Sequence, residues 1–128
     1  QVHHIEYYVN DLKASNEFYD WFMPLLSYKK IADWGEGVSW EHPNGTYLCF
    51  VQVDKENLSI KNNRQGNGLN HLAFKGGTLE QLDDLQNSLR EREIKILKRD
   101  GDYLCFEDPN QFALEVYAEE KSNANLKH

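Results

Sequence analysis

The sequence predicts an α+β fold built from two β-α-β-β-β modules in tandem. The first observation is that strand-like and helix-like segments follow the same order in both halves of the chain. The second is an internal repeat of short motifs. Trp40–Asn44 (WEHPN) matches Phe106–Asn110 (FEDPN) at an offset of 66. His4–Tyr7 (HIEY) matches His71–Phe74 (HLAF) at an offset of 67.

The first module is expected over residues 1–53 and begins with a strand at Val2–Val9, a run rich in Val, Ile and Tyr. Asn10 and Asp11 offer a turn and a helix cap. A helix follows, and Pro24 is expected to kink or tighten it. The apolar face of that helix is formed by Phe18, Phe22, Leu25 and Leu26. Strands are then expected at 28–34, 38–41 and 47–53, separated by turns rich in Gly, Pro and Asn.

A polar segment, residues 54–67, is expected to link the two modules. The second module, residues 68–118, begins with a strand at 69–74 and continues with a capping box at Thr78–Gln81. The helix that follows has an apolar stripe of Leu79, Leu82, Leu85 and Leu89. Three strands are expected at 94–97, 103–106 and 112–118. Residues 1–118 would thus form one domain, followed by a polar tail at 119–128.

Charge and composition exclude several classes of function. The chain has 14 basic and 21 acidic residues and a net charge of −7, so phosphate backbones and anionic lipids repel it. The longest apolar run, Trp21–Leu26, is far shorter than the 20 or so residues of a membrane-spanning helix. We therefore expect no nucleic-acid partner, no membrane association and a small-molecule ligand. The two cysteines are too few for a disulfide framework and indicate free thiols in the cytoplasm.

The repeat also relates titratable residues to one another. His4 and His71 occupy equivalent positions in the two modules, and pseudo-twofold symmetry would bring such positions together near the axis. Glu115 is the one charge in an apolar run, and burying it is costly unless it is paired or bound to a cation. Two imidazoles and one carboxylate suit Fe, Mn, Ni or Zn and leave coordination positions open. We expect one divalent metal ion on His4, His71 and Glu115; the alternative is that each is an ordinary strand residue.

At an offset of 66, the counterpart of Glu115 is Cys49. Three protein ligands suffice for an open catalytic site. We therefore expect Cys49 in the wall of a pocket rather than as a fourth metal ligand.

Taken together, these motifs resemble the glyoxalase/bleomycin-resistance/extradiol-dioxygenase group, the vicinal oxygen chelate (VOC) superfamily. The motifs are His4–Asp11 (HIEYYVND) before a helix with Phe18 and Tyr19, Asn70–Phe74 (NHLAF), and Asp108–Asn110 (DPN) followed by Glu115. The resemblance covers about residues 2–118 and implies a curved mixed sheet around a shared cavity. It also implies that the histidines of the first and fifth strands and the glutamate of the eighth bind a metal, which matches the three residues above.

The resemblance implies an enzyme of lyase, isomerase, thiol-transferase or dioxygenase type that chelates a small oxygenated substrate to the metal. Cys49 stands where glyoxalase I has a fourth ligand, which argues against that activity. Fosfomycin-resistance enzymes use the three-ligand set. Lys75 and Glu6 do not resemble a phosphonate site, although loops could supply Arg64 or Arg99. The alternatives are a metal-free drug-binding protein of the bleomycin-resistance type, which the acidic charge favours, and a structural or vestigial metal site.

Strand alternation places further side chains on the face of the three ligands. Glu6 is the candidate acid/base, and Tyr8 the candidate polar contact of the catalytic pair. Tyr47, Lys75 and Tyr117 are expected in the pocket with Cys49. The aromatic residues Tyr8, Tyr47, Trp40 and Tyr117 either line this pocket or fill the core. We expect a homodimer, with the site built within one chain or across two.

Overall fold

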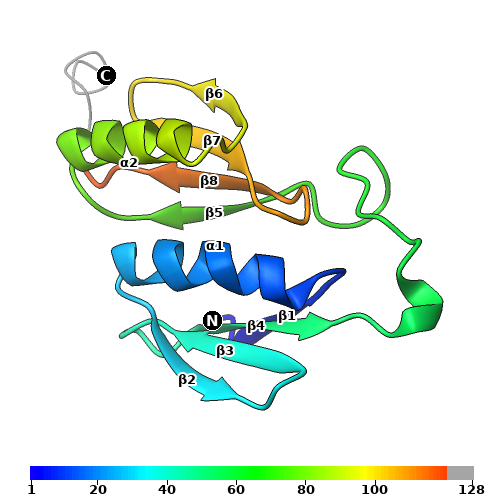
Figure 1. The fold of residues 1–128 in the computed structure, drawn as a ribbon. Helices are drawn as coiled ribbons and strands as arrows, with labels where there is room; N and C mark the ends of the chain where they lie inside the picture. The colour runs from blue at the N-terminus through cyan, green and yellow to red at the C-terminus, as the bar shows by residue number, and fades with distance from the viewer. Residues whose placement is uncertain (121–128) are drawn as a thin grey trace. The chain divides into compact units, whose positions relative to one another are not determined.

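The computed structural model describes residues 1–120, and most of the tail expected at 119–128 lies outside the described residues. The chain divides into two compact units, Gln1–Lys61 and Asn62–His128. Each unit contains a four-stranded mixed sheet and a long helix that follows its first strand (Figure 1). The predicted tandem arrangement of two β-α-β-β-β modules is therefore confirmed.

The two units have the same strand topology. In the first, the sheet order is β1-β4-β3-β2, with β1 parallel to β4 and the other pairs antiparallel. The second unit repeats this as β5-β8-β7-β6. The elements of the first unit are β1 (His4–Val9), α1 (Leu12–Leu25), β2 (Lys29–Asp33), β3 (Gly37–Glu41), β4 (Tyr47–Gln52) and the short 3-10 helix η1 (Lys55–Asn57). Those of the second are β5 (His71–Lys75), α2 (Leu79–Glu91), β6 (Ile96–Arg99), β7 (Tyr103–Glu107) and β8 (Ala113–Tyr117).

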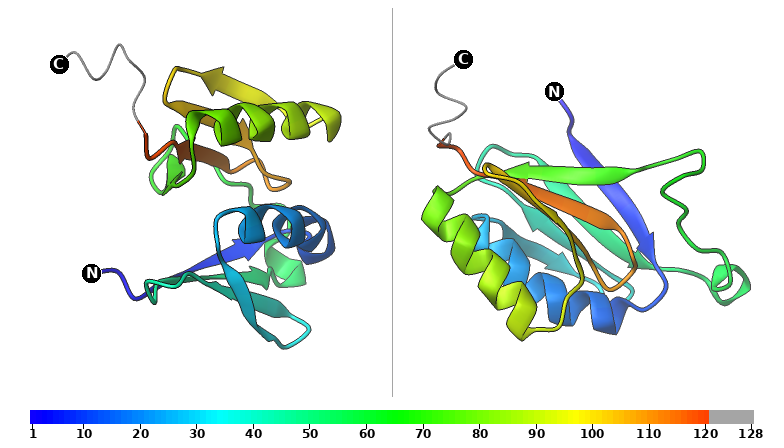
Figure 2. Two further views of the ribbon diagram at one scale, coloured as in Figure 1. Left: turned by 90° about the vertical axis from the view of Figure 1, so that its left-hand side faces the viewer. Right: turned by 90° about the horizontal axis from the view of Figure 1, so that it is seen from above.

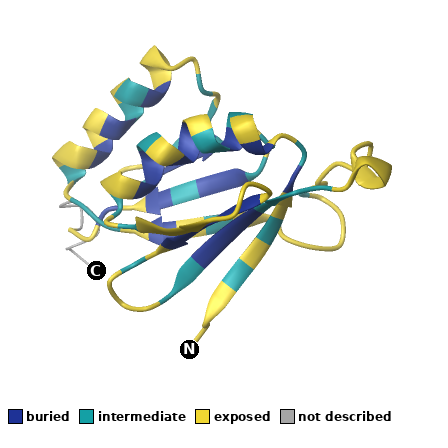
Figure 3. Ribbon diagram, turned by 60° about the horizontal axis from the view of Figure 1, so that its bottom comes forward, coloured by how far each residue is buried: buried dark blue, intermediate teal, exposed yellow. Residues whose placement is uncertain are grey.

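In each unit the helix covers one face of its own sheet (Figure 2). Phe22 and Met23 of α1 are fully buried, and the ring of Tyr19 stacks 4.1 Å from that of Phe50 on β4. In the second unit, Leu82, Leu85 and Leu89 of α2 are buried. Burial of this apolar area, at roughly 25 cal/mol per Å², is the main force that holds each helix to its sheet. The other face is more open, and β1 alternates exposed and half-buried residues (Figure 3).

Both helices end in the same left-handed turn. Ser27 (φ 70°) and Glu93 (φ 59°) each follow a helix in the left-handed conformation. The next backbone N–H donates back to the last turn, from Tyr28 to the Met23 carbonyl at 3.1 Å and from Ile94 to that of Leu89 at 2.9 Å. This is a Schellman motif in each unit.

The Schellman turns explain where the expected boundaries differ from the observed ones. Because Ile94 belongs to the turn, its strand begins at Ile96 rather than at the expected residue 94. Leu25 was expected on the apolar face of its helix, but 57% of it is exposed. It is the last residue of α1, and Pro24 before it is also exposed. Tyr19 and Met23 take the buried positions instead.

Further backbone irregularities recur at the offset of 66 that the sequence repeat shows. Strand register shifts between Lys30 and Ala32 in one unit and between Ile96 and Lys98 in the other. These shifts are β-bulges, which twist and bend the edge of a sheet. The repeat thus extends to local geometry that the aligned motifs do not contain.

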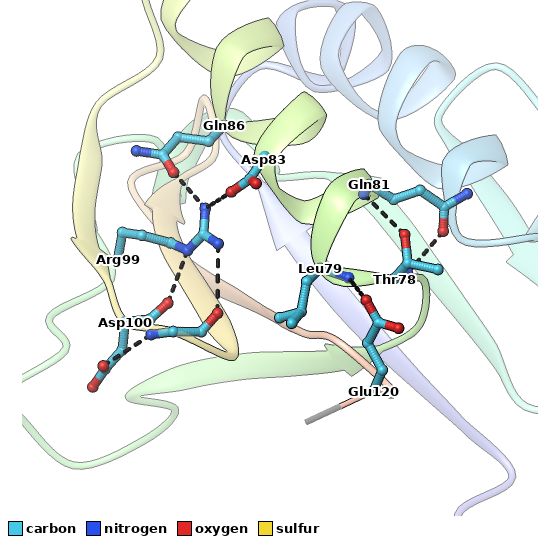
Figure 4. Close-up of polar contacts among 9 residues, drawn as sticks. Thr78, Leu79, Gln81, Asp83, Gln86, Arg99, Asp100 and Glu120 are labelled. Carbon is cyan, nitrogen blue, oxygen red and sulfur yellow. Dashed lines mark hydrogen bonds and ion pairs between the residues drawn. The ribbon is translucent and has the colours of Figure 1, made fainter. Parts of the chain in front are cut away.

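Two groups of polar contacts involve α2, one with Arg99 of β6 and one at the start of the helix (Figure 4). Arg99 of β6 reaches the helix, with Nη1 at 2.8 Å from Asp83 and 2.6 Å from Gln86. Thr78 and Gln81 form the predicted capping box at the start of α2. Among residues 1–120, neither helix has the length and hydropathy needed to cross a membrane.

Candidate functional site

The sheet of the second unit presents a row of polar side chains on the face opposite α2. Side chains alternate along a strand, so Leu72 and Phe74 of β5 face the helix while His71 and Lys75 face away from it. β8 runs parallel to β5, with His71 opposite Ala113 and Ala73 opposite Glu115. Glu115 therefore lies on the same face of the sheet as His71, two residues farther along the strands. We call this surface the open face of the second unit. Its polar members on these two strands are His71, Lys75, Glu115 and Tyr117.

His71 and Glu115 form the centre of the open face. His71 Nε2 lies 3.5 Å from Glu115 Oε1, and Glu115 is much the more buried of the two, with 14% of its side chain exposed against 42% for His71. On the other side of the imidazole ring, Nδ1 lies 2.8 Å from Asn70 Oδ1. Asn70 and Glu115 thus lie at the two nitrogens of the same imidazole ring.

Aromatic and basic groups surround Glu115 on the adjacent strands. The rings of Tyr103 and Tyr117 stack at 4.9 Å, and Lys98 Nζ lies 5.7 Å over the Tyr103 ring. Loss of hydration, with the charge and hydrogen bond of Glu115, raises the pKa of the Tyr117 hydroxyl. A hydrogen bond with Tyr103 raises the pKa of the Lys98 ammonium group. Burial raises the pKa of the Cys105 thiol, which faces Glu115 in the strand register.

A shallow hollow of about 560 Å³ lies at the far end of β5 and β8. It is lined by Ala73, Phe74, Lys75, Tyr117, Ala118 and Glu119. Three of its lining residues, Ala73, Lys75 and Tyr117, lie on the same face of the strands as His71 and Glu115. The predicted pocket residues Lys75 and Tyr117 both lie in its wall.

The first unit presents its predicted site residues on the equivalent face of β1 and β4. The His4 ring stacks on that of Tyr47, with centroids 4.6 Å apart and planes 3° apart, and His4 Nδ1 lies 2.8 Å from His3 Nδ1. Glu6 and Tyr8 follow on the same strand and are exposed. The strand registers are also equivalent, since His4 pairs with Tyr47 just as His71 pairs with Ala113.

Cys49 occupies the register position that Glu115 has in the second unit, opposite Glu6 of β1. It is buried, and its sulfur lies 3.0 Å from the Ser39 hydroxyl. The thiol therefore already has a hydrogen-bonding partner within its own sheet, as fits a wall residue.

The structure thus brings the predicted site residues together in two sets, one per unit. His71 and Glu115 are in contact, whereas His4 belongs to the other unit. Within residues 1–120, no three His, Cys, Asp or Glu side chains form a group ready to hold a metal ion. For Trp40 the sequence left two alternatives, a position in the pocket or in the core. It is buried, and alternation along β3 places it on the helix side of the sheet with Val38.

Several residues of the open face were not identified from the sequence. Asn70 contacts His71, Tyr103 stacks on Tyr117, and Lys98 lies over the Tyr103 ring. Their positions depend on loop conformation and on the register of neighbouring strands. One available signal was that Asn70 precedes His71 as His3 precedes His4. Of the two arginines that loops could supply, Arg99 is bound to α2, and Arg64 pairs with Glu107 at 2.9 Å.

Comparison with known proteins shows the family and the fold. Residues 1–116 match the family model of the Glyoxalase/Bleomycin resistance protein/Dioxygenase superfamily. Uncharacterized protein YqjT from Bacillus subtilis (strain 168) is 37% identical over 126 residues, covering 91% of this chain and 98% of YqjT. The crystal structure of a candidate glyoxalase from Bacillus halodurans is 34% identical, with a TM-score of 0.86 over 92% of this chain and 95% of that one.

A more distant structure shares the fold alone. A mutant of the genomically encoded fosfomycin resistance protein FosX from Listeria monocytogenes is 18% identical, with a TM-score of 0.65 over 91% of this chain and 88% of that one. That protein was crystallised with Mn(II) and 1S,2S-dihydroxypropylphosphonic acid.

Proposed function

The chain belongs to the glyoxalase/bleomycin resistance protein/dioxygenase superfamily, and we propose that it is a metal-dependent enzyme acting on a small oxygenated substrate. The observation that carries this proposal is the pair of His71 Nε2 and Glu115 Oε1, which face each other at 3.5 Å on the open face. Two groups with lone pairs in this geometry favour a cation beside them. The Glu115 carboxylate, with 14% of its side chain exposed, is costly to bury unless it is paired or bound to a cation.

The proposed ligands are His71, Glu115 and His4, which begins β1 at the register position that His71 has in β5. This two-histidine, one-carboxylate set suits Zn, Ni, Mn or Fe. FosX, which is similar in fold, binds Mn(II) in its crystals. A bound divalent ion would supply Lewis-acid stabilisation of negative charge on two neighbouring substrate oxygens. We assign the reaction to the lyase, isomerase or thiol-transferase type.

The remaining site residues would position the substrate and move protons. Glu6, an exposed carboxylate one alternation from His4, is the proposed acid/base, and Tyr8 next to it is the proposed polar contact. Lys75 and Tyr117 would form the wall on the second unit, with Tyr47 and Cys49 on the first. We further propose a homodimer in the cytoplasm, with the ligands drawn from one chain or from two.

Elemental analysis of untagged protein, purified without chelating resin, tests the proposal. We expect about one transition-metal ion per chain. His71→Ala should abolish it, because the remaining oxygen and nitrogen ligands are too few for tight binding. Cys49→Ser, the matched control, should keep the metal, since the thiol is bound to Ser39. Glu6→Gln should keep the metal and lower turnover of any substrate found.

Absence of metal, with none taken up when Zn, Ni, Mn or Fe is added, would overturn the enzyme proposal. The metal-free alternative would then take its place. The net charge of −7 favours that alternative, because an acidic chain attracts cationic drug-like ligands. An unchanged metal content in His71→Ala would place the metal elsewhere in the chain.

A further inference from the structure

We propose that Asn70, the residue before the proposed ligand His71, is a positioning residue that fixes which ring nitrogen of His71 is free to bind metal. The inference rests on the proposed function for its purpose, but its geometry is independent of any metal. Arg64 lies in the segment expected as a linker at 54–67, whereas Asn70 was expected in a strand at 69–74 and lies just before β5.

Arg64 anchors that segment to the turn between β7 and β8. Its Nη1 donates to Glu107 Oε2 at 2.9 Å and to the Gln111 carbonyl at 3.3 Å. Both charged side chains are largely buried, with 28% and 18% exposed, so this charge-assisted pair is stronger than a surface ion pair. The backbone of Arg64 is therefore held in a fixed place beside the first residue of β5.

The carbonyl of Arg64 sets the orientation of the Asn70 amide. Asn70 Nδ2 donates to that carbonyl at 2.9 Å. Because a carbonyl oxygen only accepts, the amide nitrogen must point toward Arg64 and the amide oxygen toward His71. The usual ambiguity between the two ends of an asparagine side chain is thus removed.

The Asn70 oxygen in turn sets the tautomer of His71. Oδ1 lies 2.8 Å from Nδ1 and can only accept, so Nδ1 carries the hydrogen. In the neutral ring, Nε2 then has a free lone pair on the side of Glu115. Without Asn70, Glu115 would instead favour a hydrogen on Nε2, and that tautomer has no lone pair to offer a metal there.

The first unit has the same arrangement with a different residue. His3 Nδ1 lies 2.8 Å from His4 Nδ1, so one ring donates to the other. If His4 donates, its Nε2 is free, as in His71. The two units thus place a side chain from the preceding residue at the same ring nitrogen, although one is an amide and the other an imidazole.

Nitrogen-15 NMR of the ring nitrogens in metal-free protein tests this directly. At a pH about two units above the ordinary histidine pKa of about 6.5, His71 should show a protonated Nδ1 and an unprotonated Nε2. Asn70→Ala should shift the hydrogen toward Nε2, whereas Asn70→Asp should restore the original pattern, because its carboxylate also accepts. Asn67→Ala, a change of another exposed asparagine in the same segment, should leave the pattern intact.

Metal affinity, measured by competition with a chelator, gives the second readout. Asn70→Ala should weaken it by about 10–100-fold, the usual cost of losing the partner of a ligating histidine. Arg64→Ala should also lower the metal affinity, because Arg64 holds the carbonyl that orients Asn70. His3→Asn should preserve the metal affinity. A wild-type His71 protonated on Nε2, or an Asn70→Ala spectrum unchanged from the wild type, would overturn the inference. Failure of the wild type to bind metal with the predicted tautomer present would overturn the proposed function instead.

Discussion

At the scale of single residues, the two units form the same turn with different amino acids. Gly45 (φ 94°) and Gln111 (φ 66°) are related by the offset of 66, and both adopt the left-handed conformation after a Pro-Asn pair. Glycine takes this conformation freely, whereas a residue with a Cβ is destabilised there by roughly 1–2 kcal/mol. The turn of the second unit therefore carries strain that the turn of the first does not.

This strain predicts that Gln111→Gly stabilises the protein. We expect a gain of up to about 1 kcal/mol in the free energy of unfolding, because relief of strain exceeds the greater flexibility of glycine in the unfolded chain. The backbone carbonyl that accepts from Arg64 is kept. Urea denaturation measures the change.

The reverse change at the equivalent position is the control. A Cβ at position 45 would have no atom of another residue, apart from its two chain neighbours, within 4 Å. Gly45→Gln should therefore destabilise through backbone conformation alone, by a similar amount. Unchanged or lower stability of Gln111→Gly would show that the turn is not strained.

At the scale of elements, the start of α2 is fixed by a reciprocal pair of hydrogen bonds. The Gln81 N–H donates to the Thr78 hydroxyl at 3.0 Å, and the Thr78 N–H donates to Gln81 Oε1 at 2.9 Å. The Leu79 N–H, a further donor of the first turn, binds the Glu120 carboxylate at 2.6 Å (Figure 4). The free N–H groups at this helix end are thus satisfied by side chains.

Thr78→Ala should lower the free energy of unfolding by about 1 kcal/mol, since alanine cannot accept the hydrogen bond at this position. Thermal unfolding followed by circular dichroism measures the loss. Thr78→Ser keeps the hydroxyl and should retain most of the stability. Equal losses in the two variants would show that the methyl group, and not the cap, stabilises the helix.

Elements could be predicted well from the sequence where local chemistry decides them. Thr78 and Gln81 indicate their capping box by type and spacing, and both of its hydrogen bonds form in the structure. Boundaries set by a helix-ending turn of atypical sequence could not be predicted in the same way. Neither Ser27 nor Glu93 is typical of a left-handed helix end, so the Schellman turns that delay the following strands left no sequence signal.

At the scale of the whole molecule, the repeat is the reason why a site could be proposed at all. Equivalent positions in the two repeated motifs are enough to relate His4 to His71. Asn70 was expected inside a strand at 69–74 and Arg64 only as a residue that a loop could supply, so the contacts from Arg64 to Asn70 and from Asn70 to His71 were not predicted. Cys49 illustrates what the repeat can predict, since it pairs with Glu6 just as Glu115 pairs with Ala73, while its place in a pocket wall stays a prediction.

Because the chain divides into two units, metal binding tests whether ligands from both units hold the same ion. If His4 of Gln1–Lys61 and His71 of Asn62–His128 hold the same ion, binding must stabilise both units at once. A ligand at 100 times its dissociation constant adds about 2.7 kcal/mol. Amide hydrogen exchange should therefore slow on adding metal in both β4 and β8, which lie at the centres of their sheets.

The histidine variants separate the contributions of the two units. His4→Ala should confine the metal-dependent protection to β8, because His71 and Glu115 remain as a weak pair, and His71→Ala should remove it from both strands. Protection of a single unit in the wild-type protein would contradict a shared ion. Protection of both units that depends on protein concentration would indicate that the two histidines come from different chains, because only an ion held between subunits couples binding to association.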